Sequence, residues 1–258
     1  MTQKEGDQHK NDMYGDIGGR DESAPGVLPP IPSATVVLLR DGDEGVEVLM
    51  LKKNSKITFG GMWVFPGGKI DAEDYQDDAS DVANTEALEA AARSAAAREA
   101  EEEAGIRLSA DDFVWFAHWT PPPGPQKRFA TWFFAGLAND THDEITIDDG
   151  EIKDHAWITP AAALERHRRG EIDLVPPTWV TLYHLSRYSP ATEVMKHFES
   201  QVAKIYSTRV VKAEDGNRVA MWTGDAGYEV WNPDMSGERH RLVMAKDGFE
   251  FQNSIERY

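Results

Sequence analysis

The sequence predicts an α/β protein whose main layered domain spans about residues 32–175. Short runs rich in β-branched and aromatic residues recur between turn residues, which indicates strands. An alanine-rich segment that ends at Gly105 and a shorter segment that ends at Gly170 are typical of helices. Strands interleaved with two helices favour a sheet that is covered by helices.

The domain opens with a predicted β-hairpin. Its strands are expected at 35–39 and 46–51, because both runs are rich in Val and Leu and the Asp/Gly turn signal at 41–45 separates them. A third short strand is expected at 62–65, where Pro66-Gly67-Gly68 ends it.

The long helix is expected from about Ala83 to Gly105, since Ala, Glu and Arg are strong helix formers and glycine is a suitable C-cap. An acidic loop, 74–81, precedes it. The remaining elements are strands at 113–119, 129–137 and 153–158, and a helix at 161–169 that Thr159-Pro160 starts and Gly170 ends.

Residues 176–258 are expected to form an extension of two helices followed by β-hairpins. The helices are expected at 179–187 and 191–206, and the strands at 207–212, 218–223, 241–245 and 249–252. Residues 1–31 are rich in Gly, Asp, Lys, Gln and Pro, so we expect a disordered tail there. The predicted parts are therefore the tail 1–31, the layered domain 32–175 and the extension 176–258.

The chain carries a formal net charge of −18 and has no cysteine. Without cysteine there are no disulfides, no thiolate catalysis and no zinc–cysteine sites, which favours a cytoplasmic protein. The negative charge disfavours nucleic acid and anionic membranes as partners, because both repel such a surface. Either solubility or a group of metal-binding carboxylates explains the acidity, and only the clustering of the carboxylates decides between them.

Three carboxylates cluster near the end of the long predicted helix. Glu99, Glu102 and Glu103 have the spacing i, i+3, i+4, so their side chains share one helical face. They repel one another unless a cation lies between them, and Mg²⁺ prefers oxygen ligands. The alternative is a solvated acidic face. The glycine pair Gly67-Gly68 shortly before the helix favours a site, because glycines let the backbone approach a ligand closely.

This region resembles the Nudix hydrolase family, whose signature reads Gly-x5-Glu-x7-Arg-Glu-U-x-Glu-Glu-x-Gly-U, where U is an apolar residue. The second half matches at every fixed position, namely Arg98, Glu99, Glu102, Glu103 and Gly105, with Ala100 and Ile106 in the apolar positions. In the first half, the Glu of the signature falls on Asp74 when counted from Gly68 and on Glu73 when counted from Gly67. From Tyr75 to Ala97, 23 residues stand where the family has seven, which is an insertion of 16.

The resemblance implies a Nudix-type α/β/α sandwich with a mixed sheet. It also implies hydrolysis of a nucleoside diphosphate linked to another moiety, by attack of water on phosphorus. Glu99, Glu102, Glu103 and the carbonyl of Gly67 would hold Mg²⁺ or Mn²⁺, while Arg98 would pair with acids beside the site.

A general base must accept a proton from the attacking water. Glu102 and Glu103 are candidates that also lie near the metal. Family members often use an acid from a distal loop, and here Glu144 and Glu151 are the candidates. We favour Glu151, because it lies just before the strand that carries Trp157.

Basic and aromatic residues suggest where a substrate binds. Lys127, Arg128 and Phe129 open a strand and are expected to hold a phosphate and to stack on a ring. Lys69 follows the glycine pair and is expected to contact the substrate's far phosphate. Lys52, Lys53 and Lys56 are candidates for the same contact, and for each of the four lysines the alternative is a solvated side chain.

The insertion resembles a branch that contains coenzyme A diphosphatases, so coenzyme A and acyl-coenzyme A are the substrates we expect first. ADP-ribose and NADH stay open as alternatives. The resemblance also allows a homodimer, and it allows a non-catalytic module that only binds its ligand. The small-molecule nucleotide conjugate is the partner expected in each case.

Overall fold

The computed structural model describes residues 23, 25–56, 59–75, 85–124, 127–138, 144–148, 150–245 and 247–255. Two compact units divide the chain. The larger unit comprises Pro30–Thr120 and Phe129–Tyr206, and the smaller comprises Met1–Pro29, Pro121–Arg128 and Ser207–Tyr258. Each unit is described by itself below.

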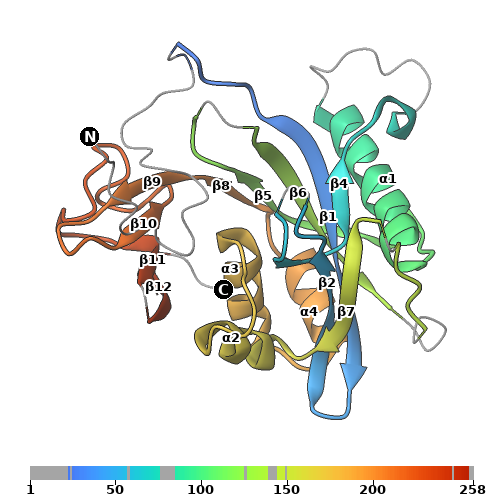
Figure 1. The fold of residues 1–258 in the computed structure, drawn as a ribbon. Helices are drawn as coiled ribbons and strands as arrows, with labels where there is room; N and C mark the ends of the chain where they lie inside the picture. The colour runs from blue at the N-terminus through green and yellow to red at the C-terminus, as the bar shows by residue number, and fades with distance from the viewer. Residues whose placement is uncertain are drawn as a thin grey trace. The chain divides into compact units, whose positions relative to one another are not determined.

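A mixed β-sheet forms the centre of the larger unit (Figure 1). Its strands are β1 (Ile31–Gly42), β2 (Gly45–Lys53), β3 (Trp63–Val64), β4 (Gly67–Lys69), β5 (Val114–Thr120), β6 (Phe129–Leu137), β7 (Ile152–Ile158) and β8 (Lys204–Ser207). The strand order is β3-β2-β1-β6-β5-β8, while β4 also pairs with β1 and β7 with β2. β1 is parallel to β6 and antiparallel to β2, which confirms the predicted mixed sheet and the predicted hairpin.

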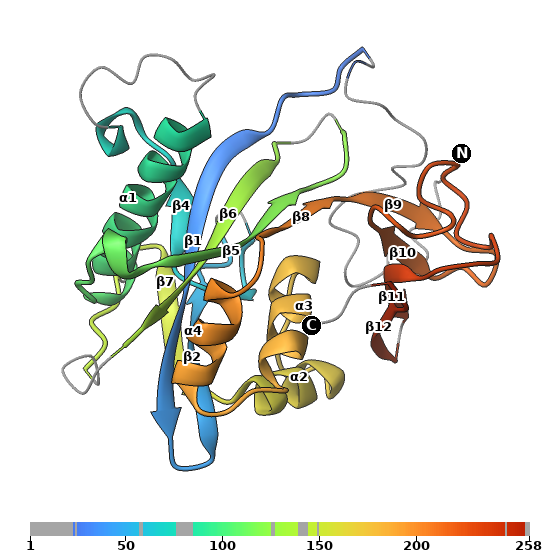
Figure 2. The same ribbon diagram turned by 180° about the vertical axis from the view of Figure 1, so that it is seen from behind.

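Helices cover both faces of this sheet. The long helix α1 (Thr85–Ala104) lies on one face, and α2 (Pro160–Arg168), α3 (Pro176–Leu185) and α4 (Ala191–Glu199) lie on the other side (Figures 1 and 2). Two short 3-10 helices, Ala72–Asp74 and Ala110–Asp112, flank α1 in the sequence. The predicted α/β/α sandwich is confirmed.

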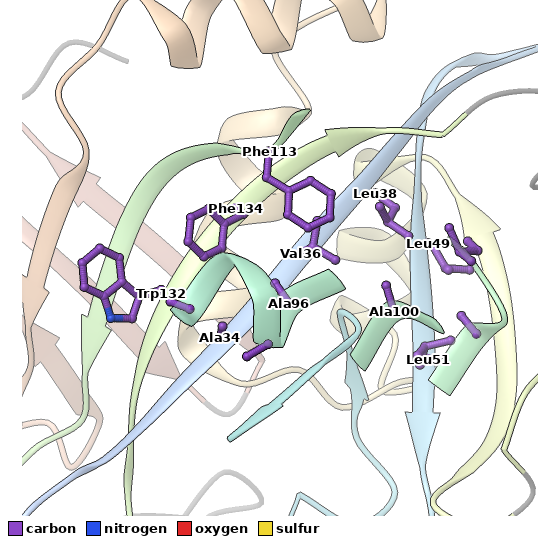
Figure 3. Close-up of a cluster of buried hydrophobic side chains, with 14 of the residues drawn as sticks. Ala34, Val36, Leu38, Leu49, Leu51, Ala96, Ala100, Phe113, Trp132 and Phe134 are labelled. Carbon is purple, nitrogen blue, oxygen red and sulfur yellow. The ribbon is translucent and has the colours of Figure 1, made fainter. Parts of the chain in front are cut away.

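Small side chains allow α1 to pack closely on the sheet. Several of its alanines, among them Ala96 and Ala100, are buried against Val36, Leu38 and Leu49 (Figure 3). Because alanine has the highest helix propensity and the smallest side chain that still packs, one face of α1 is both strongly helical and close to the strands. This close packing holds the last turns of α1 against the edge of β4.

Aromatic residues fill the opposite face of the sheet. Phe116 of β5 stacks on Phe198 of α4, with ring centroids 4.3 Å apart. Trp119 of β5 stacks on Tyr206 of β8 at 3.7 Å. The prediction of one helix over 191–206 is therefore wrong after residue 199, because residues 204–207 form a strand beside β5. Helix propensity does not report such tertiary pairing and ring stacking.

The smaller unit contains a four-stranded antiparallel sheet. Its strands are β9 (Arg209–Lys212), β10 (Arg218–Met221), β11 (His240–Ala245) and β12 (Gly248–Asn253), in the order β12-β11-β10-β9. Asp225 and Arg241 form a buried ion pair with hydrogen bonds of 2.5 and 2.6 Å. These strands agree with the β-hairpins predicted for the end of the chain.

The predicted boundary at residue 175 stays a prediction. By backbone contacts, α3 and α4 belong to the larger unit, which runs to Tyr206. The predicted tail 1–31 and the acidic loop 74–81 fall largely outside the described residues, since 1–22, 24 and 76–84 are not described. Among the helices of the described residues, none is long and apolar enough to cross a membrane.

Candidate active site

The turn at Pro66-Gly67-Gly68 is fixed against β1. The hydroxyl of Thr35 and the N–H of Val36 both donate to the carbonyl of Pro66, at 2.6 and 3.0 Å. Gly67 lies opposite Thr35, and a Cβ at Gly67 would lie only 2.5 Å from the carbonyl oxygen of Ala34. Glycine is therefore required at position 67 for β4 to approach β1 so closely, and the turn is held in a fixed position beside α1.

The three glutamates of α1 differ in their surroundings. Glu103 is buried, accepts a hydrogen bond of 3.0 Å from the N–H of Gly67, and is bound by the ammonium of Lys53. The carboxylate of Glu99 lies so close to Gly68 that a Cβ there would overlap it. Glu102 is exposed, with 60% of its side chain accessible. The shared face predicted from the spacing thus lies beside the glycine turn.

Arg98 connects this face to the preceding loop. Its guanidinium donates two hydrogen bonds to Asp74, at 3.0 and 2.9 Å, and one each to Glu99 and Glu102, at 3.0 and 3.1 Å. It also donates to the carbonyl of Lys69 at 3.1 Å. Such bidentate pairing with a carboxylate suits the planar guanidinium. The acid that pairs with Arg98 is therefore present despite the insertion.

The structure also decides the register of the first half of the signature. Asp74 is buried and accepts from both Arg98 and the N–H of Asp71, the latter at 2.8 Å, whereas Glu73 is exposed. Of the two positions that the sequence left open, Asp74 is the one that contacts Arg98. The shorter side chain reaches Arg98 because the 3-10 helix Ala72–Asp74 brings its backbone close.

Burial raises the pKa of two glutamates at the site. Burial and the neighbouring charge of Glu103 raise the pKa of Glu99 to about 7, although Arg98 acts in the opposite direction. Burial also raises the pKa of Glu103, although Lys53 and the N–H of Gly67 favour its charged form. Both carboxylates therefore lie in surroundings that disfavour their charged form.

The donor atoms suit a hard divalent cation. Glu99, Glu102, Glu103 and the Gly67 carbonyl offer only oxygen, which Mg²⁺ and Mn²⁺ accept. Within the described part of the chain, no three acidic or histidine side chains are already arranged as a metal site. Two cations account for this, because Lys53 binds Glu103 while Arg98 binds the other two glutamates. The residues fit such a cation provided that the carboxylates turn toward it.

A second loop brings Glu151 to the same place. Its carboxylate lies 3.6 Å from the ammonium of Lys53, which also binds Glu103. Glu144 is exposed at the start of the segment 144–148, whose Thr146 N–H donates to the carbonyl of Ala104 at 3.1 Å. Of the two distal-loop acids, Glu151 is the one that shares a cation with a glutamate of α1.

The predicted substrate-binding residues belong to both compact units. Lys69 has an exposed side chain, and its backbone carbonyl accepts a hydrogen bond from the guanidinium of Arg98. Phe129, the first residue of β6, lies 6.1 Å from Phe59 between ring centroids. Lys127 is exposed in the smaller unit. Arg128 is buried there and donates to the carbonyls of Leu28 and Pro121, at 2.9 and 3.1 Å. The guanidinium of Arg128 thus binds backbone, and its predicted part in substrate binding stays a prediction.

The sequence did not point to Asn54, and it predicted a role for Lys53 that differs from its contacts in the structure. Lys53 was expected to reach a substrate phosphate, whereas its ammonium is buried between two glutamates. Asn54 hydrogen-bonds to the loop of Glu151. Neither contact has a local signal, because the partners lie about 50 and 100 residues away in the sequence. Four consecutive residues of β2, 48–51, are buried, so alternation along the strand does not reveal that Lys53 points inward.

Comparison with known proteins places this site in a family. Residues 29–177 match the family model described as NUDIX domain. The chain is 27% identical over 142 residues to the acyl-coenzyme A diphosphatase NUDT19 of Xenopus laevis, covering 52% of this chain and 37% of that protein. It is 28% identical over 153 residues to the protein of the same name from Gallus gallus, covering 55% and 39%. The chain thus spans less than two fifths of the length of these relatives.

The fold has a counterpart among solved structures. A NUDIX hydrolase from Alicyclobacillus acidocaldarius superposes with a TM-score of 0.54 at 22% sequence identity. The match covers 66% of this chain and 96% of that one. It supports the fold of the larger unit.

Proposed function

Because the chain belongs to the NUDIX domain family, which it matches over more than half of its length, we propose that it is a metal-dependent pyrophosphohydrolase. Its substrate is a nucleoside diphosphate linked to another moiety. The observation that carries this proposal is the carboxylate face of α1, where Glu99 and Glu103 lie against the backbone of Gly68 and Gly67. A solvated acidic face does not explain a buried Glu103 or a glycine turn fitted to Glu99.

Mg²⁺ or Mn²⁺ would be held by Glu99, Glu102, Glu103 and the Gly67 carbonyl. Bound there, such a cation neutralises the pyrophosphate, lowers the pKa of a bound water and stabilises the leaving oxygen. A chain with a net charge of −18 needs this compensation to bind an anionic substrate.

The side chains of the protein have separate tasks in the proposed reaction. Glu151 accepts the proton of the attacking water, whose oxygen forms the new bond to phosphorus while the bond to the bridging oxygen breaks. The products are a nucleoside monophosphate and a phosphorylated partner. Arg98 fixes the orientation of Glu99 and Glu102, and Lys53 balances the charge of Glu103. Lys69, which is exposed and follows the glycine turn, contacts a substrate phosphate in this proposal.

Coenzyme A and acyl-coenzyme A are the substrates that we propose first. The name of the two curated relatives supports this choice, as does the insertion inside the signature. ADP-ribose and NADH contain the same kind of pyrophosphate and are the competitors to test.

The test measures phosphoanhydride hydrolysis for coenzyme A, acyl-coenzyme A, ADP-ribose and NADH, with Mg²⁺ or Mn²⁺ and with chelator. We expect hydrolysis that needs the metal, and a loss of about 10²-fold or more in kcat for Glu102→Gln. Glu101→Gln is the matched control, because Glu101 lies on the same helix turn but pairs with Arg107 at 2.6 Å. Equal activity of Glu102→Gln and wild type would overturn the catalytic role. Ligand binding without turnover would favour the non-catalytic module.

A further inference from the structure

The end of strand β2 lies beside the loop that carries Glu151. β2 and β7 pair regularly up to Lys52, which lies opposite Asp154, but Lys53 lies opposite Ile152, so the register shifts by one residue. A β-bulge of this kind bends the strand and turns its side chains, and bulges are frequent beside active sites. Here the shift brings the start of β7, and with it Glu151, to the level of Asn54.

Asn54 forms two hydrogen bonds to this loop. Its backbone N–H donates to the carbonyl of Glu151 at 2.7 Å, and its side-chain amide donates to the carbonyl of Gly150 at 2.9 Å. The side-chain oxygen of the same residue accepts from the N–H of Lys56 at 3.2 Å. One asparagine thus uses both ends of its amide, one for the loop of Glu151 and one for its own turn.

Hydrogen bonds to Asp148 also hold the backbone around Glu151 in place. The carboxylate of Asp148 accepts from the N–H of Gly150 at 2.9 Å, and the carbonyl of Asp148 accepts from the N–H of Ile152 at the same distance. Ile152 is fully buried and anchors the start of β7. The backbone on both sides of Glu151 is therefore fixed, with Asn54 as its attachment to β2.

The side chain of Glu151 depends on this backbone for its direction. It is 60% exposed, and its contact with a charged group is the 3.6 Å approach to Lys53. An exposed carboxylate on a flexible side chain is held weakly by one long ion pair. The position of its carboxylate is therefore set mainly by where the loop places its backbone.

We propose that Asn54 is a positioning residue that holds the loop of Glu151 against β2 and so directs the Glu151 carboxylate toward the reacting water. This inference rests on the proposed function. The loop-directed hydrogen bonds of Asn54 go to the carbonyls of Gly150 and Glu151, so it acts through Glu151. A displacement of a reacting group by about 1 Å lowers a rate by up to about 100-fold, which makes such a hydrogen bond consequential for kcat.

The test compares Asn54→Ala, Glu151→Gln and the double variant with wild type. We expect Asn54→Ala to lower kcat about 10-fold to 100-fold with KM unchanged. In the Glu151→Gln background the same substitution should have no further effect, because there is no longer a carboxylate to position. Asn217→Ala is the matched control, since Asn217 also bonds in a turn, to Asp215, but lies in the smaller unit. We expect it to retain the wild-type rate.

A second measurement does not depend on activity. Hydrogen exchange of the metal-free protein should become faster within 148–152 in Asn54→Ala and stay unchanged in α1. Unchanged exchange in that loop would overturn the inference, as would a kcat loss that multiplies with that of Glu151→Gln. An active wild type whose kcat is insensitive to Asn54→Ala would overturn this inference alone. A wild type that hydrolyses none of the four substrates would overturn the proposed function and, with it, the catalytic part of the inference.

Discussion

Lys53→Met removes the cation that balances Glu103 and keeps a side chain of similar length. The ammonium of Lys53 binds Glu103 and lies 3.6 Å from Glu151. The side chains of Lys53 and Glu103 are only 10% and 5% exposed, so water does not replace the lost partner. Among the described residues, the hydrogen bond that Glu103 keeps in this variant comes from the N–H of Gly67.

The size of the effect follows from this burial. Removing one partner of a buried ion pair leaves an uncompensated charge and costs about 3–5 kcal/mol. For a chain of this size, about 2–4 °C of melting temperature corresponds to 1 kcal/mol, so we expect a decrease of about 6–20 °C. Lys196→Met is the control, because Lys196 pairs with Glu193 at 3.4 Å but is 70% exposed. Losing this exposed ion pair should lower the free energy of unfolding by less than about 1 kcal/mol.

Calorimetry with and without Mn²⁺ distinguishes charge balance from simple packing. A divalent cation at the glutamates supplies the positive charge that Lys53→Met lacks, and its binding stabilises the folded state. We therefore expect saturating Mn²⁺ to recover at least half of the lost melting temperature. Destabilisation of the same size with and without Mn²⁺ would refute the reasoning, and so would a metal-free variant as stable as wild type.

Three further predictions concern the glycine turn, pH and the smaller unit. Gly68→Ala places a Cβ in the space of the Glu99 carboxylate, so calorimetric titration should give a Mn²⁺ affinity about 10-fold or more below that of wild type. An affinity equal to that of wild type would contradict the close fit between Gly68 and Glu99. The pKa of Glu99 is raised from 4.5 to about 7, so the metal-free folded protein binds this proton more tightly than the unfolded chain. The stability of the metal-free protein should therefore fall as the pH rises from about 4.5 to about 7. Over the same range the Mn²⁺ affinity should rise by up to about tenfold per pH unit, because the cation displaces this proton. A Mn²⁺ affinity that is flat between about pH 5 and 7 would contradict this sign. Asp225→Asn leaves the buried Arg241 without its counter-charge and should destabilise the smaller unit by about 3–5 kcal/mol. Hydrogen exchange within 207–255 should become faster, and the Mn²⁺ affinity should stay unchanged.

Local sequence rules predicted most elements of the larger unit. The helix that ends before Gly105 was predicted because alanine and glutamate favour helix and glycine tolerates the positive φ of 70° found there. The Thr159 cap of α2 was predicted for the same kind of reason, and its hydroxyl accepts from the N–H of Ala162. Each of these features involves residues only a few positions apart.

The error over 191–206 has a different origin. Helix propensity continues past Glu199, but Tyr206 stacks on Trp119, a residue nearly 90 positions earlier. Arg128 makes a contact of similar range, because its guanidinium donates to the carbonyl of Leu28, 100 residues earlier. Contacts over such separations leave no periodic pattern in the sequence around either partner.

The carboxylate face of α1 was determined by the sequence alone, since helical geometry places Glu99, Glu102 and Glu103 together whatever the rest of the chain does. Which acid meets Arg98, and which cation balances Glu103, was decided only by the tertiary structure. Asp74 was selected over Glu73 by the turn before α1, and Lys53 reaches Glu103 across 50 residues because β2 and α1 pack together. The physical reason is that spacing along a helix is a local property, whereas charge pairing in a buried site depends on how separate elements pack.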